Sequence, residues 1–165
     1  MVSSNRCPRP WPTQAMEQCR NSHFPFERSV VARVRKIRVL LADSEEEFSA
    51  TLADRLRLQG FAVHCARSAA EAVAELEGGR FDVALVGSDF VDMKGTDLLV
   101  HCKSLSPSRA AILLAAHGAV DAAIVGMERG ADDFLMKPID LTVLADKIRD
   151  VHHRGSSQNS QRQQR

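Results

Sequence analysis

The sequence predicts an α/β protein with a doubly wound, five-stranded parallel sheet, a (βα)₅ arrangement of three layers with helices on both faces. Two observations support this fold class. Short aliphatic runs alternate with helical patterns through the middle of the chain, as they do in βαβ units. Aromatic residues are scarce, with no Tyr and one Trp among 165 residues. The interior is therefore expected to be aliphatic, which suits strands that are covered on both faces.

Five apolar runs are expected to form the strands. Each run is short enough for a strand, and helical periodicity or turn residues separate it from the next run. The runs lie at residues 37–42 (IRVLLA), 61–66 (FAVHCA), 81–86 (FDVALV), 110–115 (AAILLA) and 132–136 (DDFLM).

The segments between these runs carry helix start and stop signals. Ser44 precedes Glu47 by three residues, and Ser68 precedes Glu71 in the same way. This is capping-box spacing, so both serines are expected to be N-caps. The other three helices are expected after Gly95, over residues 120–129 and after Asp140.

Both ends of the chain differ from this pattern. Residues 1–36 show no apolar period over most of their length, and residues 154–165 form a polar, low-complexity tail. Such segments offer no face to bury, so both are expected to be disordered. The folded domain is expected to span residues 37–153.

Charge and cysteine content limit the classes of function. The ends are basic, whereas residues 37–151 hold twelve basic and nineteen acidic residues. The arginines of the ends are sparse and lack interleaved aromatics, so no nucleic-acid contact is expected. No apolar run is long enough to cross a membrane, and no signal peptide is visible, so we expect a cytoplasmic protein. Cys7, Cys19 and His23 offer three metal ligands without a fourth, so no metal site is expected there.

Three segments give the domain a specific resemblance. VLLADSEEEF is similar to the first strand and acidic turn of response-regulator receivers, and FDVALVGSDFVDMKGTDLL is similar to their third strand and phosphorylation loop. ILLAAHGAVDAAIVGMERGADDFLMKPID resembles their fourth strand through the Lys-Pro that follows the fifth. Residues 37–153 thus resemble the receiver domain of two-component phosphorelay signalling, which implies a flavodoxin-like fold.

The resemblance also implies a phosphorylation site, and three of its positions have changed. In the family the acceptor aspartate lies eight residues before the glycine that opens the third helix. That glycine is Gly95 here, so the acceptor position is occupied by Gly87. The second acid of the first-strand pair corresponds to Ser44, and the hydroxyl residue that ends the fourth strand corresponds to Ala115. Glycine has no nucleophile to accept a phosphoryl group. We therefore expect a pseudo-receiver, without catalytic residues, that acts by binding proteins.

Other family positions are retained. They are Asp43 as the first acid, Lys137 at the phosphate-lysine position and Phe134 at the aromatic switch position. Asp43 and Lys137 are expected to form an ion pair across the strand ends. Without a hydroxyl at Ala115, Phe134 is expected to hold one dominant rotamer.

Asp89 leaves a second reading open, in which the chain is a working phosphotransfer receiver with a relocated acceptor. Asp89 lies two residues beyond Gly87 and so points to the same side of an extended strand. Using it would require the loop before Gly95 to lose two residues. Asp43 and Asp89 would offer Mg²⁺ fewer carboxylates than the family normally supplies, so its binding is expected to be weak. No cofactor is therefore expected.

The expected partners are proteins, such as a histidine kinase or another signalling protein. The resemblance implies that dimers and partners use the face formed by the fourth helix, fifth strand and fifth helix, where acids are in excess. An enzyme of another kind is not expected. The sequence has no GxGxxG after the first strand, no Walker lysine motif and no pairing of nucleophile and base at the strand ends.

Overall fold

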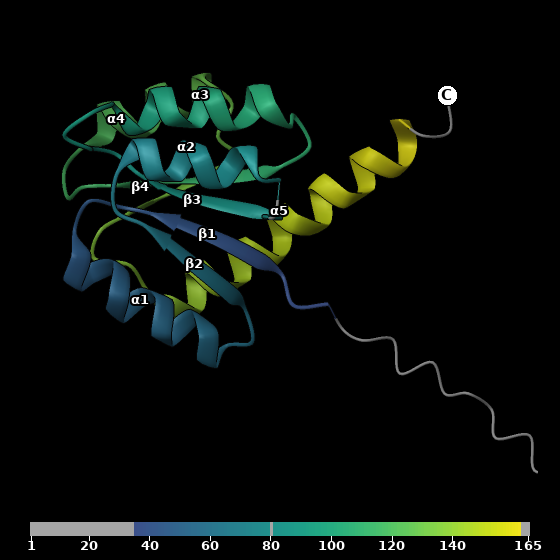
Figure 1. Cartoon of the computed structure of the whole chain (residues 1–165), viewed down its shortest axis with the longest axis horizontal. Helices are drawn as coiled ribbons and strands as arrows, with labels where there is room; N and C mark the ends of the chain where they lie inside the picture. The colour runs from purple at the N-terminus through teal and green to yellow at the C-terminus, as the bar shows by residue number, and fades with distance from the viewer. Residues whose placement is uncertain (1–34, 80, 163–165) are drawn as a thin grey trace, which may run out of the picture. The chain divides into compact units, whose positions relative to one another are not determined.

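A computed structural model describes residues 35–79 and 81–162 (Figure 1). Of the extension predicted for residues 1–36, only the last two residues are described, and Cys7, Cys19 and His23 lie outside the described residues. The strands are β1 Arg38–Ala42, β2 Ala62–Ala66, β3 Val83–Gly87, β4 Ala110–Ala115 and β5 Asp133–Met136. The helices are α1 Glu46–Leu58, α2 Ala69–Glu77, α3 Gly95–Leu105, α4 Val120–Glu128 and α5 Leu141–Arg162.

The five strands form one parallel sheet in the order β2-β1-β3-β4-β5. The predicted fold class is confirmed, and every predicted strand lies within two residues of the observed bounds. Strand order reverses between β1 and β3, because β1 pairs with β2 on one side and with β3 on the other. In open sheets of this kind, functional groups gather at the carboxyl ends of the strands near such a reversal.

Two separate cores cover the two faces of the sheet. Successive residues of a strand point to opposite faces, so Val39 and Leu41 pack with α1 and α5, whereas Leu40 and Ala42 pack with α2 and α3. Figure 1 shows α1 and α5 on one side of the sheet and α2, α3 and α4 on the other. The predicted three layers are present. In the described part of the chain, no helix is both long and apolar enough to span a membrane.

The two predicted N-caps have different outcomes. The Ser68 hydroxyl accepts a hydrogen bond from the backbone N–H of Glu71 at 3.1 Å, so this cap is confirmed. The Ser44 cap is wrong, because α1 begins later, after Glu45, and the Ser44 hydroxyl instead donates to the Asp89 carbonyl at 3.0 Å. The physical reason is the turn after β1, in which the Asp43 carboxylate accepts the Glu45 N–H at 2.9 Å.

Helix α5 is longer than the sequence indicated. Disorder was expected from residue 154, but the helix continues to Arg162, so the predicted boundary at His153 is wrong. The extension passes close to the loop before β4: a Cβ built on Gly155 would lie only 2.7 Å from the carbonyl oxygen of Ser108. Glycine thus lets α5 pass close to the loop before β4. The serine hydroxyls of residues 156 and 157 donate to carbonyls four residues back, within the helix.

Candidate functional site

The candidate site lies where β1, β3 and β5 end. Asp43 follows β1, Gly87 is the last residue of β3, and Lys137 follows β5. Parallel pairing brings these carboxyl ends to one edge of the sheet. The peptide bond between Lys137 and Pro138 is cis.

Asp43 and Lys137 form an ion pair, as predicted, in which Asp43 is buried and Lys137 is partly buried. Lys137 Nζ lies 2.8 Å from Asp43 Oδ2, and the Asp43 side chain is only 3% exposed. The same ammonium lies 2.7 Å from Glu45 Oε1 and 4.2 Å from the centre of the Phe48 ring. Lys137 is therefore held by two carboxylates and an aromatic face, which is a favourable place for a cation.

The pKa of Lys137 reflects these neighbours. Burial is the largest influence and by itself lowers the pKa, but hydrogen bonding and charge attraction from Asp43 and Glu45 outweigh it. The pKa of Lys137 is raised above its ordinary value as a result. The lysine is thus a fixed positive charge beside Asp43 at physiological pH.

The Asp43 carboxylate is engaged on both of its oxygens. Oδ1 accepts the Glu45 backbone N–H at 2.9 Å, and Oδ2 faces Lys137. The backbone at Asp43 is held as well, since its N–H donates to the Ala66 carbonyl at 3.1 Å. Residue 43 is therefore fixed between β1, β2 and the segment after β5.

Gly87 lies directly against this carboxylate. A Cβ built on Gly87 would be 2.8 Å from Asp43 Oδ2 and 3.0 Å from Asp43 Cγ. Contacts of that length require an atom to shift. The carboxyl group of Asp43 thus fills the space into which a side chain at position 87 would extend.

Asp89 lies apart from the ion pair. Its side chain is exposed, and its carboxylate accepts a hydrogen bond from the Ser88 hydroxyl at 2.6 Å. Its backbone forms an isolated antiparallel bridge with Lys94. Within residues 35–79 and 81–162, no ion pair or hydrogen bond joins the Asp89 side chain to Asp43 or Lys137.

The two predicted switch positions lie on neighbouring strands. Ala115 ends β4, is fully buried and pairs with Met136. Phe134 lies on the edge strand β5 with 37% of its surface exposed. The methyl group of Ala115 offers no hydrogen bond to the site.

Three residues at this edge were not predicted from the sequence: Glu45, Phe48 and Ser88. Glu45 and Phe48 both contact Lys137, and the buried Ser88 accepts the Ala116 N–H at 3.3 Å while donating to Asp89. Glu45 lies in a run of three glutamates after the first strand, which is a signal for an acid near the strand end but does not say which of the three faces inward. Ser88 and Phe48 gave no signal.

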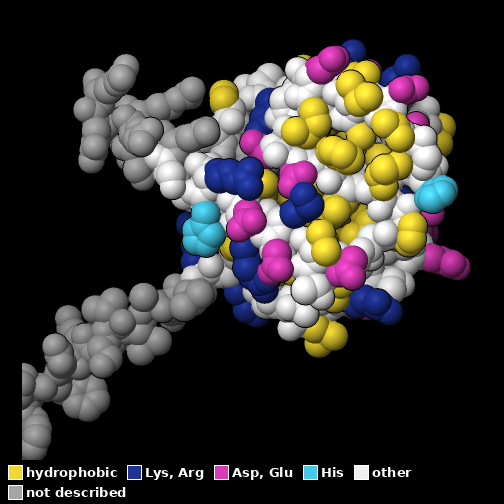
Figure 2. Space-filling view, turned by 180° about the vertical axis from the view of Figure 1, so that it is seen from behind, with side chains coloured by type: hydrophobic (Ala, Val, Ile, Leu, Met, Phe, Trp, Pro, Cys, Tyr) yellow, Lys and Arg dark blue, Asp and Glu magenta, His cyan; other side chains and the backbone are white. Residues whose placement is uncertain are grey.

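The face formed by α4, β5 and α5 is more apolar than its sequence indicated. Some of the acids expected to dominate it are paired within the chain: Asp132 pairs with Lys103 at 2.5 Å, and Asp133 pairs with Lys147. Large hydrophobic side chains are exposed beside them, and Figure 2 shows side chains of this kind gathered on the face seen from behind. These residues are Val120, Ile124 and Met127 of α4, Phe134 of β5 and Val143 of α5.

Comparison with known proteins identifies the family. The model of the response regulator receiver domain matches residues 39–149, so the chain belongs to the response regulator receiver family of two-component signalling. Among curated proteins, it is 33% identical over 126 residues to the transcriptional regulatory protein TcrA of Mycobacterium tuberculosis, an alignment that covers 74% of this chain and 49% of TcrA. It is 31% identical over 124 residues to PrrA of Mycobacterium bovis, covering 74% of this chain and 53% of PrrA. The chain thus spans about half the length of these curated relatives.

Solved structures agree with the fold. A CheY-like receiver domain from Methanospirillum hungatei superposes with a TM-score of 0.70 at 26% identity, covering 74% of this chain and 98% of that one. A receiver domain from Clostridium thermocellum gives a TM-score of 0.70 at 27% identity, covering 73% and 97%. Receiver domains are signalling modules that interact with proteins such as kinases.

Proposed function

We propose that this chain is a pseudo-receiver, which binds protein partners without being phosphorylated on an aspartate. The observation that carries the proposal is the position of Asp43. Its carboxylate is fixed by Lys137 at 2.8 Å and fills the space beside Gly87. The residue that would accept a phosphoryl group is absent, and a side chain of the chain itself occupies its place.

The same geometry argues against a magnesium ion at this edge. Magnesium requires near-octahedral oxygen ligands and is usually bound through one or two carboxylates. Here Asp43 already shares its oxygens with Lys137 and the Glu45 N–H, while Ser44 and Gly87 supply no carboxylate. The residues therefore do not fit the ion, and an acyl-phosphate reaction that depends on it has no support.

The alternative acceptor, Asp89, is poorly placed for the reaction. A phosphoryl group on its exposed carboxylate would need a cation to neutralise its oxygens. Lys137, at the phosphate-lysine position, is already paired with Asp43 and Glu45. These contacts support the pseudo-receiver over a relocated phosphorylation site.

A phosphorylation assay on the full chain tests this proposal. The protein is incubated with Mg²⁺ and acetyl phosphate, and intact mass and amide NMR spectra are recorded, with Asp89→Asn as the matched variant. We expect no phosphoryl adduct in either protein and no shifts at Asp43 or Lys137. An adduct on the native chain that Asp89→Asn removes would replace this proposal with the phosphotransfer reading.

We further propose that partners bind the α4-β5-α5 face, and that the protein acts in the cytoplasm without contacting nucleic acid. The exposed apolar side chains of α4 and the edge position of β5 support this surface. A patch of this kind on a small domain is typical of protein contacts. The partner is a kinase or other signalling protein, or a second copy of this chain.

Photo-crosslinking tests the surface. A photoreactive residue is placed at Ile124, or as a control at Leu58, which is 89% exposed on α1. We expect the probe at position 124, and not the one at position 58, to give a discrete protein adduct that mass spectrometry identifies. Equal labelling from both positions would remove the α4-β5-α5 assignment.

A further inference from the structure

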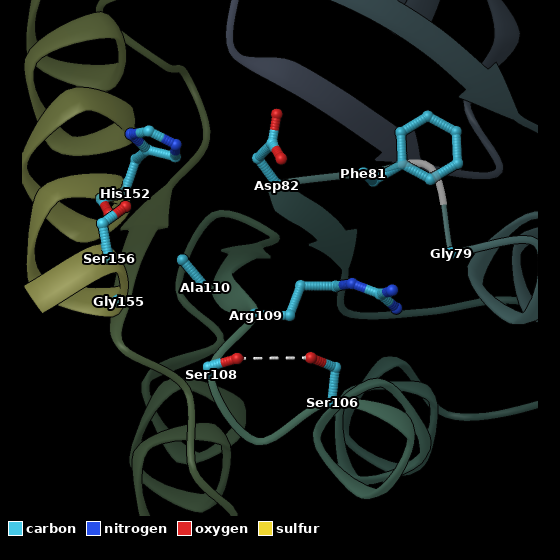
Figure 3. Close-up of a pocket in the computed structure, with 10 residues that line it drawn as sticks. All are labelled: Gly79, Phe81, Asp82, Ser106, Ser108, Arg109, Ala110, His152, Gly155 and Ser156. Carbon is cyan, nitrogen blue, oxygen red and sulfur yellow. Dashed lines mark hydrogen bonds between the residues drawn. The ribbon is translucent and has the colours of Figure 1, made fainter. Parts of the chain in front are cut away.

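A polar pocket lies at the edge of the sheet opposite to the candidate site, where β3 and β4 begin. Its volume is about 210 Å³, several times the roughly 30 Å³ that one water occupies in the liquid. Figure 3 shows α5 on one side of it and the loop before β4 at its base. The residues that line it are Gly79, Phe81, Asp82, Ser106, Ser108, Arg109, Ala110, His152, Gly155 and Ser156.

Arg109 gives this pocket an unbalanced positive charge. The residue is only 8% exposed, and its guanidinium donates to the Leu76 carbonyl at 3.3 Å. Its other neighbour is the buried Cys102 thiol, whose pKa burial raises, so that the thiol is neutral. In the described part of the chain Arg109 has no carboxylate partner. Buried charges are normally paired, because desolvation is costly.

The acid of the pocket does not balance this charge. Asp82 is already committed to Arg38, which donates to both of its oxygens from the side chain, at 2.8 and 3.1 Å, and from the backbone N–H at 2.9 Å. Lys103, which donates to the Arg109 carbonyl, is in turn paired with Asp132. Asp82 and Asp132 are therefore already paired with other cations. Among the described lining residues, Arg109 is the one charged side chain without an oppositely charged partner.

Hydrogen-bond donors complete the pocket. The hydroxyls of Ser106 and Ser108 face each other at 3.4 Å on its floor (Figure 3). On the α5 side, Nδ1 of His152 is shielded from solvent and has no hydrogen-bond partner within the described residues. The close approach of α5 at Gly155, which a Cβ would obstruct, brings this histidine to the pocket. An arginine with neighbouring hydroxyl donors is suited to a tetrahedral oxyanion.

We propose that this pocket binds a small phosphate-type oxyanion, free or as a phosphomonoester, with the Arg109 guanidinium as its anchor and the hydroxyls of Ser106 and Ser108 beside it. The site lies at the amino ends of the strands, away from the edge that holds Asp43 and Lys137. Binding would hold the extension of α5 against the loop before β4.

The proposal is tested by NMR titration of the full chain with inorganic phosphate and, separately, with glycerol phosphate, at ionic strength matched with chloride. We expect saturable amide shifts at Ser108, Arg109 and Gly155 with at least one of the two ligands. Saturation by inorganic phosphate identifies the free ion as sufficient, and saturation by the ester alone identifies a small phosphorylated molecule. The absence of saturation with both, or shifts centred on Gly87 and Lys137, would overturn the proposal.

Variants assign the shifts to the pocket. Arg109→Gln should weaken binding about tenfold or more through the loss of a charge-assisted contact, whereas the matched control Arg149→Gln, whose arginine pairs with Asp146, should leave it unchanged. Ser108→Ala removes one hydroxyl and is expected to keep the fold. It therefore tests phosphate binding at the pocket even if Arg109→Gln does not fold. It should weaken binding a few-fold, and unchanged affinity in Ser108→Ala would contradict the assignment.

Discussion

The two edges of the sheet handle buried charge in opposite ways. At the carboxyl edge, Lys137 lies between Asp43 and Glu45, so its charge is paired within the chain. At the amino edge, Arg109 is buried without a carboxylate among the described residues. One buried cation is thus paired within the chain, whereas the other has no carboxylate partner among the described residues. Under the proposed function, the paired edge does not bind phosphate and the unpaired one is where an anion can bind.

The largest expected effect on stability comes from breaking the ion pair between Lys137 and Asp43. Lys137→Met leaves the Asp43 carboxylate buried and unpaired, which should lower the free energy of unfolding by about 3 kcal/mol or more. The measurement is urea denaturation at neutral pH. Arg57→Met, which breaks an exposed pair with Asp54, is the control and should cost less than about 1 kcal/mol. Equal losses in the two variants would contradict the buried character of the Lys137 pair.

The same pair predicts a dependence on alkaline pH. A group with a raised pKa contributes stability that is fully present below its unfolded pKa, about 10.4 for lysine, and is lost as pH rises through the folded value. Unfolding curves of the native chain and Lys137→Met should therefore converge above about pH 10.5. A constant difference across that range would show that charge is not the source of the effect.

A methyl group at position 87 should have the next largest effect. Gly87→Ala places a Cβ 2.8 Å from Asp43 Oδ2, so the carboxylate must move away from Lys137 at a cost of about 1–3 kcal/mol. A double-mutant cycle with Asp43→Ala, followed by denaturation, isolates the cause. The loss of unfolding free energy caused by Gly87→Ala should largely disappear in the Asp43→Ala background. If the full loss persists there, the Asp43 carboxylate is not what the new methyl group contacts.

A smaller effect is expected at the amino edge from Asp82. Burial raises its pKa, but the hydrogen bonds and charge of Arg38 lower it more, so that the net pKa is below the ordinary value. The stability from this pair is present above the unfolded pKa of about 3.9 and is lost as pH falls through the folded pKa. Asp82→Asn should cost about 1 kcal/mol at neutral pH in this partly exposed pair. When stability is measured as a function of pH, the destabilisation by Asp82→Asn should shrink below about pH 4. A destabilisation that grows in acid would contradict the lowered pKa of Asp82.

The smallest expected effect concerns Phe134. Ala115 has a methyl group where the family resemblance implies a hydroxyl, so its side chain offers no hydrogen bond to couple the carboxyl edge to rotation of the ring. Side-chain NMR should therefore show one dominant rotamer, unchanged by Mg²⁺ with acetyl phosphate. Two comparably populated rotamers would show that a switch survives.

Much of the fold could be read from the sequence because its signals are local. Aliphatic runs such as residues 110–115 gave the strands, and the Ser68–Glu71 spacing gave a correct cap. The Asp43–Lys137 pair was also predictable, because parallel strands place both residues at one edge. Ser44 failed because Asp43 takes over the first backbone contact of the turn, which spacing alone does not show.

Other features depend on tertiary contacts that no local pattern encodes. The extension of α5 passes close to Ser108 through Gly155, although its polar composition suggested disorder. The amino-edge pocket depends on that extension, and the lack of a carboxylate near Arg109 is visible only once all its neighbours are placed. The choice of Glu45, rather than either glutamate after it, as the partner of Lys137 depends on where α1 begins.

A crystal structure of the full chain grown with Mg²⁺ and beryllofluoride, a phosphoryl mimic, tests the central claim most directly. We expect Asp43 Oδ2 to contact Lys137 Nζ beside Gly87, with neither Mg²⁺ nor beryllofluoride bound at that edge. Beryllofluoride on Asp89, or a metal ion between Asp43 and Asp89 with Lys137 released, would contradict it.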